Sequence, residues 1–240
     1  QGQFAVVAEQ AKILTKQYPT ALLVWNILGA SSSQIGKFDE AIDAYKKAIS
    51  IKPDYAEAYS NIGVVLRDQG KLEEAIDAYK NSILLNPNDG DTYFNMGIAL
   101  KDQGKLEEAI DAYKKAISLK PDYAQAYNNM GIALRDQDKL DDAIEAYNKA
   151  LKIRPGHAET YNNLGITLEK QGKSGEAIEA YKKSISLKPD YAKAYNNIGA
   201  AFKDKGKLEE AVEAFKKALS LEPDNAEAYN NMALTLNNQG

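Results

Sequence analysis

The chain has 240 residues, a net charge of −4 and no cysteine. The slight acidic excess argues against a general phosphate-binding surface, so nucleic acid is not expected as a partner. Without cysteine the chain has neither disulfide bonds nor thiolate metal sites. No apolar run approaches the roughly 20 residues of a membrane span, and no signal-peptide pattern opens the sequence. We therefore expect a cytoplasmic location and no membrane partner.

A single period of 34 residues organises the whole sequence. Each period closes with a proline, which cannot continue the helix that precedes it. A fixed period of this size, with the same punctuation in every copy, indicates a stacked repeat array. The residues that keep this spacing are Pro19, Pro53, Pro87, Pro121, Pro155, Pro189 and Pro223, together with Gly29, Gly63, Gly97, Gly131, Gly165 and Gly199.

Taken in chain order, residues 1–21 are predicted to be the second half of a repeat, with Phe4, Val7, Ala11 and Leu14 on its buried face. Residues 226–240 are predicted to be a lone first helix that ends at Gly240. Because both ends fall inside a repeat, we expect a piece of a longer protein, whose exposed apolar ends allow end-to-end association. Between them lie six full repeats, so that 1–240 forms one array of fourteen helices: 22–55, 56–89, 90–123, 124–157, 158–191 and 192–225.

Each repeat is predicted to form two helices that pack antiparallel to each other. Numbering each repeat from the equivalent of Ala56 as position 1, small or apolar residues at positions 4, 7, 8 and 11 share one helix face, and those at 17, 20, 21, 24, 27 and 28 share another. Gly70, at position 15, is expected to end the first helix in a left-handed conformation; Asp138 replaces this glycine in one repeat and predicts a strained turn. Gly63 lets the helices approach closely, and Tyr79 fills the adjacent space.

The pattern aromatic-x-x-Leu/Ile/Met-Gly, followed by Gly-Lys-Leu-x-x-Ala-Ile-x-Ala-Tyr and a closing Pro, resembles the tetratricopeptide repeat (TPR) family over nearly the whole chain. The resemblance implies an all-α, right-handed superhelical solenoid of antiparallel helix pairs, whose first helices line a concave groove that binds peptides or proteins. The stretch LTKQYPTALLVWNILG, at 14–29, also resembles bacterial TPR segments that precede glycosyltransferase-like or sulfotransferase-like domains. We expect a non-catalytic interaction scaffold, with a substrate-recruiting segment of a larger transferase as the alternative.

A repeated asparagine at position 6 is the strongest candidate for ligand contact. Positions 2, 6, 9 and 13 lie opposite the core face, and a carboxamide can pair with either group of a peptide main chain. A similar ladder is known in the TPR segment of O-GlcNAc transferases and in some nuclear import receptors, which implies binding of extended polypeptide. Alternatively, duplication of one ancestral repeat would leave the same asparagine in every copy as an inherited polar surface with no role in binding. The predicted contact residues are Asn61, Asn95, Asn129, Asn163, Asn197 and Asn231 at position 6, and Asn128, Asn162 and Asn196 at position 5.

The charged residues predict a scaffold and no catalytic site. Positions 2 and 13 are mostly acidic until Lys170 and Lys193, which favours a ligand with a basic stretch over the acidic part. Recurring pairs such as Glu73 and Glu74 open the second helices, where negative charge is favourable. His157 is the only histidine, and without a second histidine or a cysteine it is expected to be a solvated loop residue. We predict no catalytic residue, no cofactor and no metal site.

Overall fold

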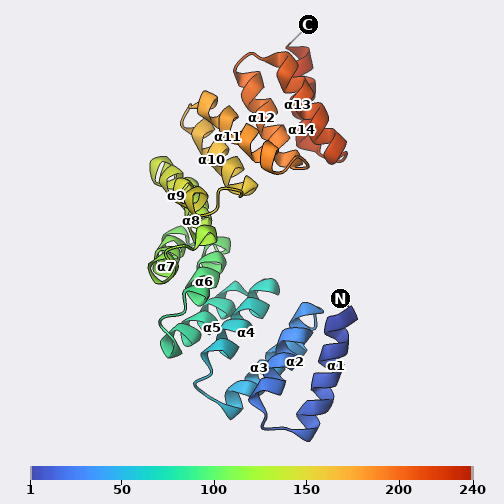
Figure 1. Cartoon of the computed structure of the whole chain (residues 1–240), viewed down its shortest axis with the longest axis vertical. Coiled ribbons are helices and arrows are strands. Elements are labelled where there is room, and N and C mark those ends of the chain that lie inside the picture. The colour runs from blue at the N-terminus through green and yellow to red at the C-terminus, as the bar shows by residue number, and fades with distance from the viewer. Residues whose placement is uncertain (1, 239–240) are drawn as a thin grey trace. The chain divides into compact units, whose positions relative to one another are not determined.

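The computed structural model of the chain describes residues 2–238. Within these residues the protein is entirely helical and contains fourteen α-helices that alternate as first and second helices of the repeats (Figure 1). The first helices are α2 (Leu22–Gln34), α4 (Ala56–Asp68), α6 (Gly90–Asp102), α8 (Ala124–Asp136), α10 (Ala158–Lys170), α12 (Ala192–Asp204) and α14 (Ala226–Asn237). The second helices are α1 (Gly2–Gln17), α3 (Phe38–Ile51), α5 (Leu72–Leu85), α7 (Leu106–Leu119), α9 (Leu140–Ile153), α11 (Ser174–Leu187) and α13 (Leu208–Leu221).

The turn inside each hairpin depends on a left-handed residue at position 15. Gly70 has φ of 77°, and its N–H donates to the carbonyl of Arg67 at 2.8 Å, which closes the end of α4. Asp138 occupies the same position with φ of 62° and is the only residue other than glycine with a positive φ in the described part of the chain. The predicted strain at Asp138 is therefore confirmed, because a side chain disfavours this conformation.

The two helices of a hairpin touch through the glycine at position 8 and the aromatic ring at position 24. A Cβ built on Gly63 would lie 2.6 Å from the Cε1 atom of Tyr79, and Tyr79 is fully buried. The same contact joins Gly131 to Tyr147 and recurs in all six hairpins that contain both helices. A buried ring of this size contributes up to about 4–6 kcal/mol as an upper bound, from its area and ~25 cal/mol/Å². The close approach predicted from the small residue is confirmed.

The described residues fall into two compact units, which we call unit 1 (up to Pro121) and unit 2 (from Asp122). Within unit 1, α2 contacts α4 and α4 contacts α6; within unit 2, α8, α10, α12 and α14 contact one another in sequence. Among the described residues of either unit, consecutive second helices make no such contact. The first helices are therefore the inner, more closely spaced side of each unit. That 1–240 is a single continuous array stays a prediction.

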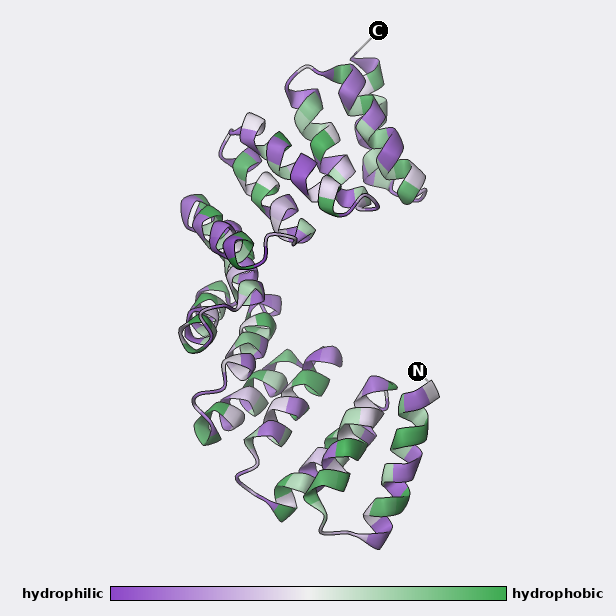
Figure 2. Ribbon diagram, in the orientation of Figure 1, coloured by the Kyte–Doolittle hydropathy of each residue, from purple (hydrophilic) through white to green (hydrophobic). Residues whose placement is uncertain are grey.

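The helices at the two ends of the described chain differ from the sequence prediction in their burial. Ala11 is buried as expected, but Phe4 is 46% exposed and Leu14 is 39% exposed. In α14, Tyr229 is 51% exposed and Leu236 is 46% exposed, whereas the equivalent Leu134 of α8 is 7% exposed. Figure 2 colours these apolar stretches of α1 and α14 green. The prediction of a buried face was wrong for these side chains, because it assumed the other helix of the same hairpin. Among residues 2–238, α1 packs only on α2, and α14 packs only on α12 and α13. The predicted end of the last helix at Gly240 lies outside the described residues.

Candidate functional site

The position-6 asparagines all lie on first helices and are all half-buried. Each stands near the middle of its helix, and all except Asn231 lie two residues before the glycine that packs on the second helix. Because the first helices of a unit contact one another, these carboxamides recur at one rung per repeat along the inner side of the unit. We call this set the position-6 ladder: Asn61 and Asn95 in unit 1, and Asn129, Asn163, Asn197 and Asn231 in unit 2.

The position-5 asparagines of unit 2 are placed differently from their sequence neighbours. Asn128, Asn162 and Asn196 are buried and hydrogen-bonded to residues of the following repeat. Asn162 Oδ1 accepts a hydrogen bond from Asn197 Nδ2 at 2.9 Å, and Asn196 Oδ1 accepts one from Asn231 Nδ2 at 3.3 Å. In the free chain these three side chains therefore join repeats, and the position-6 carboxamides beside them are the less buried of the two sets. A helical wheel places the two positions about 100° apart, but it does not show which of them the following repeat covers.

A longer hydrogen-bond chain runs through the first junction of unit 2. His157 Nδ1 lies 2.7 Å from Thr160 Oγ1, and Thr160 Oγ1 donates to Asn128 Oδ1 at 2.9 Å. Asn163 Nδ2 donates to the same oxygen at 3.2 Å, and Asn128 Nδ2 donates to Asn129 Oδ1 at 3.3 Å. The direction of the bond between His157 and Thr160 depends on the imidazole tautomer.

This placement corrects the prediction for His157. The side chain is half-buried and hydrogen-bonded at the start of α10, and is not a freely solvated loop residue. Burial lowers the pKa of His157 from its ordinary value, and the charge of Arg154 lowers it further. The imidazole therefore belongs to the junction between repeats, where its neutral form is favoured.

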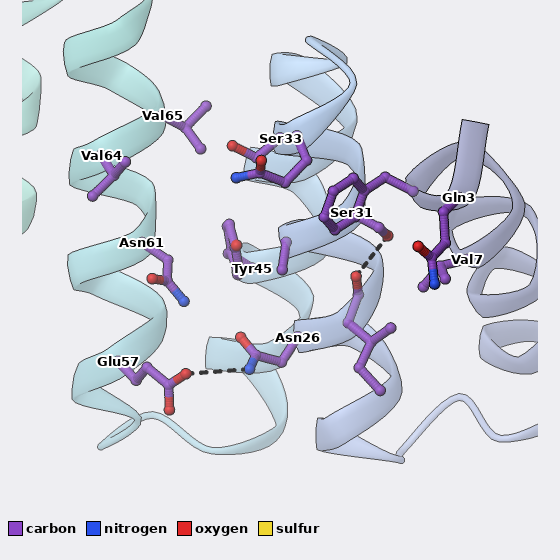
Figure 3. Close-up of a pocket in the computed structure, with 14 residues that line it drawn as sticks. Gln3, Val7, Asn26, Ser31, Ser33, Tyr45, Glu57, Asn61, Val64 and Val65 are labelled. Atoms are coloured by element: carbon purple, nitrogen blue, oxygen red, sulfur yellow. Dashed lines mark hydrogen bonds between the residues drawn. The ribbon is translucent and has the colours of Figure 1, made fainter. Parts of the chain in front are cut away.

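Unit 1 contains a cavity of about 560 Å³ on the same side as the ladder (Figure 3). Ala30 and Ser33 of α2 stand on its wall at positions 9 and 12. Position 9 carries valine or isoleucine in the next four repeats, and position 12 carries a long charged residue in every later full repeat. Asn26 Nδ2 donates to Glu57 Oε1 at 3.4 Å at its rim, while Asn26 Oδ1 is buried without a partner. Asn61, the first rung of the ladder, also lines it. Ala30 and Ser33 depart from the repeat pattern, and this departure is the sequence signal for the cavity.

The charges along the inner side are more balanced than the sequence predicted. The position-13 aspartates are exposed, and three of them are paired with the basic residue before them: Arg67–Asp68 at 2.9 Å, Lys101–Asp102 at 3.2 Å and Arg135–Asp136 at 2.9 Å. The repeat 158–191 reverses this order, with Glu169 at position 12. The hydroxyl of Tyr181 donates to Glu169 Oε2 at 2.6 Å, and burial raises the pKa of that carboxyl. The acidic character of the ladder side therefore comes mainly from position 2.

The described residues contain no group of three or more histidine, cysteine, aspartate or glutamate side chains placed to hold a metal ion. Glu73 and Glu74 are exposed in the first turn of α5, as expected for charges at the positive end of a helix. From α1 to α14 as described, none of the helices has the length and apolar character needed to cross a bilayer. The candidate sites are the rungs Asn61 and Asn95 with the cavity in unit 1, and the four rungs of unit 2.

Comparison with solved structures shows the same helical architecture. The crystal structure of MamA is 37% identical to this chain, with a TM-score of 0.64, and the match covers 69% of this chain and 97% of MamA. Pseudomonas aeruginosa pilF aligns with a TM-score of 0.76 at 20% identity, over 89% of this chain and 97% of that one. YrrB, described as a TPR protein with an unusual peptide-binding site, aligns with a TM-score of 0.64 at 24% identity, over 79% of this chain and 98% of YrrB. The last two likenesses concern the fold alone.

Curated sequences and family models agree with this architecture. The peroxisomal targeting signal receptor of Candida albicans is 44% identical over 46 residues, and that of Kluyveromyces lactis is 41% identical over 46 residues. Each match covers 19% of this chain and 8% of the receptor, so the chain spans a small part of these relatives. A family model described as "TPR repeat" matches 33–66, 63–104, 99–137 and 201–240, more than half of the chain, and models described as "Tetratricopeptide repeat" match 122–190 and 180–213. The chain belongs to the tetratricopeptide repeat family.

Proposed function

We propose that this TPR chain is a non-catalytic scaffold that binds an extended peptide segment of a partner protein along the position-6 ladder. The observation that carries the proposal is the half-buried carboxamide in the middle of every first helix from α4 to α14. Asparagine is a poorer helix former than alanine by roughly 0.5–0.7 kcal/mol, so its repetition at one position costs stability each time. Binding of a peptide main chain would explain why asparagine recurs despite this cost, because a carboxamide can hydrogen-bond to peptide groups whatever the side chains of the peptide.

Within unit 1, the cavity offers a place for a side chain of a peptide bound at Asn61. Phe4 and Val64 give it apolar walls, and Glu57 and Asn26 give it a polar rim. A cavity of about 560 Å³ lies within the range of small-ligand pockets and accommodates a large apolar side chain. The carboxylate at the rim favours a basic residue next to that side chain. The targeting signal receptors matched over 46 residues support a recognition role, since they are named as receptors.

The triple variant Asn129→Ala, Asn163→Ala, Asn197→Ala tests the ladder. The probe is a capped 12-residue peptide selected from a random phage-displayed library on the wild-type chain, and its affinity is measured by calorimetry. Loss of three carboxamides should weaken binding at least tenfold, because each hydrogen bond contributes about 0.5–1.5 kcal/mol. Asn148→Ala, an exposed asparagine of the second helix α9, is the matched control and should bind as wild type. Equal affinity of the triple variant and wild type would refute the ladder.

We also propose that copies of the chain associate end to end through the exposed faces of α1 and α14. α1 is a second helix that leaves Phe4 and Leu14 exposed, and α14 is a first helix that leaves Tyr229 and Leu236 exposed. Since a repeat consists of a first and a second helix, α14 of one copy can pair with α1 of another. Their pairing would bury these side chains, each worth about 1.5–3 kcal/mol. Light scattering after size exclusion should show a mass that rises with concentration, and Leu236→Asp should abolish the rise. A monomer at all concentrations would contradict the proposal.

A further inference from the structure

The last turn of α10 carries its two charged residues in the reverse order from α4, α6, α8 and α12. In those four helices a half-buried arginine or lysine at position 12 precedes an exposed aspartate at position 13. In α10, Glu169 takes the half-buried position and Lys170 takes the exposed one. The exchange therefore places a carboxylate where the equivalent helices keep a cation. Those cations are Arg67, Lys101, Arg135 and Lys203.

The side chain of Glu169 is held in place by the core of its own hairpin. The hydroxyl of Tyr181 donates to Glu169 Oε2 at 2.6 Å. Tyr181 is fully buried, and its ring is so close to Gly165 that a Cβ built there would lie 2.5 Å from Tyr181 Cε1. The ring therefore fixes the position of its hydroxyl, and the hydroxyl fixes one oxygen of the carboxylate. An ionised carboxylate accepts hydrogen bonds at both oxygens, so turning it over exchanges two equivalent atoms.

The second oxygen of this carboxylate is available to a ligand. Glu169 Oε1 has no partner among residues 2–238, and it is not one of the side-chain oxygens shielded from solvent. Burial raises the pKa of this carboxyl, the hydrogen bond from Tyr181 lowers it, and the charge of Asp204 raises it. Arg135 acts on Tyr181, but its guanidinium is paired with Asp136 at 2.9 Å. Within the described part of the chain, Glu169 therefore forms no ion pair.

The hairpin itself does not require a carboxylate at this position. Tyr79 occupies the place of Tyr181 in α5, and its hydroxyl is buried without a partner among the described residues. In α13 the same place is taken by Phe215, which has no hydroxyl. Removing a carboxylate from water without a cation costs stability. Recognition of a cation from outside the chain explains why an acid stands here.

Position 12 lies on the same side of the repeat as the ladder. In unit 1 the equivalent Ser33 lines the cavity together with Tyr45 at position 24 and the rung Asn61 (Figure 3). Within α10, Glu169 follows the rung Asn163 by six residues, which is about 9 Å along the helix axis. A peptide main chain held at Asn163 therefore reaches Glu169 only through a long side chain.

We infer that Glu169 recognises a lysine or arginine side chain of the peptide that binds at the unit 2 rungs. The inference rests on the proposed peptide-binding function and names the ligand more closely. Both side chains are long, and both bring N–H donors and a positive charge to the free oxygen. The half-buried position strengthens this attraction relative to an exposed carboxylate. Tyr181 is a positioning residue, since it acts on the ligand only through Glu169.

A double-mutant cycle between the chain and the library-selected capped 12-residue peptide tests the inference. Each lysine or arginine of the peptide is replaced in turn by glutamine, and every peptide is measured by calorimetry on the wild-type chain and on Glu169→Gln. Glutamine keeps an oxygen that accepts from Tyr181 but carries no charge. Glu176→Gln removes an exposed carboxylate of the second helix α11 and is the matched control. Circular dichroism checks that each variant is folded at the temperature of the assay.

Glu169→Gln should bind the selected peptide at least about fivefold more weakly, because a charge-assisted hydrogen bond is lost. One basic residue of the peptide should account for this loss. Its replacement should weaken binding to the wild-type chain by a similar factor, and binding to Glu169→Gln by less than about twofold. Glu176→Gln should bind as wild type. Wild-type binding by Glu169→Gln, a loss that no basic residue of the peptide accounts for, or a selected peptide without lysine and arginine would overturn the inference.

Tyr181→Phe tests the positioning role, and Phe215 shows that this repeat accommodates the ring without its hydroxyl. The variant should bind the selected peptide more weakly, but it should bind the peptide that lacks the coupled basic residue as the wild-type chain does. A merely structural role would weaken both peptides alike, and that result would exclude positioning. Tyr79→Phe removes a hydroxyl that has no partner among the described residues and should change neither affinity.

The failure of the proposed function is a separate result in the same assay. If the alanine triple variant binds the selected peptide as well as wild type, the rungs of unit 2 are not the contact surface and the proposed function fails. If the triple variant loses binding and Glu169→Gln does not, the rungs bind peptide and only the recognition of a basic residue is wrong.

Discussion

Gly131→Ala tests the contact that holds each hairpin together. A Cβ at residue 131 would lie 2.6 Å from Tyr147 Cε1 and 2.8 Å from Cδ1, so a fully buried ring must move by about 1 Å to restore normal contact. Overpacking of this kind costs about 1–3 kcal/mol, and we expect the upper half of that range. The better helix propensity of alanine offsets about 1 kcal/mol. The net loss of stability should be about 1–2 kcal/mol, or a fall in melting temperature of about 2–8 °C.

Urea unfolding followed by circular dichroism measures this loss, and a double-mutant cycle identifies its cause. In a Tyr147→Leu background the ring is absent, so Gly131→Ala should become neutral or stabilising. Ala233 provides the matched control, because it occupies position 8 of α14 and is exposed, with no second helix following among the described residues. Ala233→Gly should destabilise by up to about 1 kcal/mol. A stabilising effect of Gly131→Ala alone, or the same loss in both backgrounds, would refute the steric account.

Three further predictions follow from individual contacts. Asp138→Gly should stabilise the chain by about 1 kcal/mol in urea unfolding, because glycine adopts the positive φ without strain. The reverse change Gly104→Asp should destabilise the chain by a similar amount. A less stable Asp138→Gly variant would contradict this reasoning. Burial lowers the pKa of His157 below its ordinary value of 6.5, so the folded chain favours the neutral imidazole. This contribution to stability is fully present above pH 6.5 and is lost as the pH falls through the folded pKa. The melting temperature should therefore fall between pH 7 and pH 5, and less so in His157→Asn; equal slopes would exclude the histidine as the cause. Because position-13 carboxylates such as Asp68 are already paired, the association rate of a basic selected peptide should fall less than about tenfold between 50 and 500 mM salt, and a steeper fall would refute the pairing.

The hairpin could be predicted from the sequence because its determinants recur in every copy. Three residues each predict one local feature, and the structure confirms all three. Gly63 predicts the close approach of the two helices, Tyr79 predicts the ring that fills the contact, and Gly70 predicts the left-handed turn. Phe4 and Leu14 were predicted to be buried by the same pattern and are exposed. Periodicity identifies the face that packs against a partner helix, but it does not show whether that helix is present.

The candidate site was less predictable than the fold. The sequence pattern selects an asparagine-rich stripe on the first helices, but it does not separate the buried Asn162 from the half-buried Asn163 beside it. That difference depends on where the following repeat packs, since Asn162 bonds to Asn197, 35 residues away. His157 was taken for a solvated residue because its partner Thr160 becomes a partner only when the chain turns into α10. Contacts across repeat junctions are tertiary and leave no short-range signal.

The most direct measurement of the central claim is a crystal structure of the chain bound to the library-selected peptide. We expect an extended main chain on the first-helix side, with peptide main-chain groups within about 3.2 Å of the carboxamides of Asn163 and Asn197. A peptide bound on the second helices, or one that passes the first helices without touching these carboxamides, would contradict the proposed function.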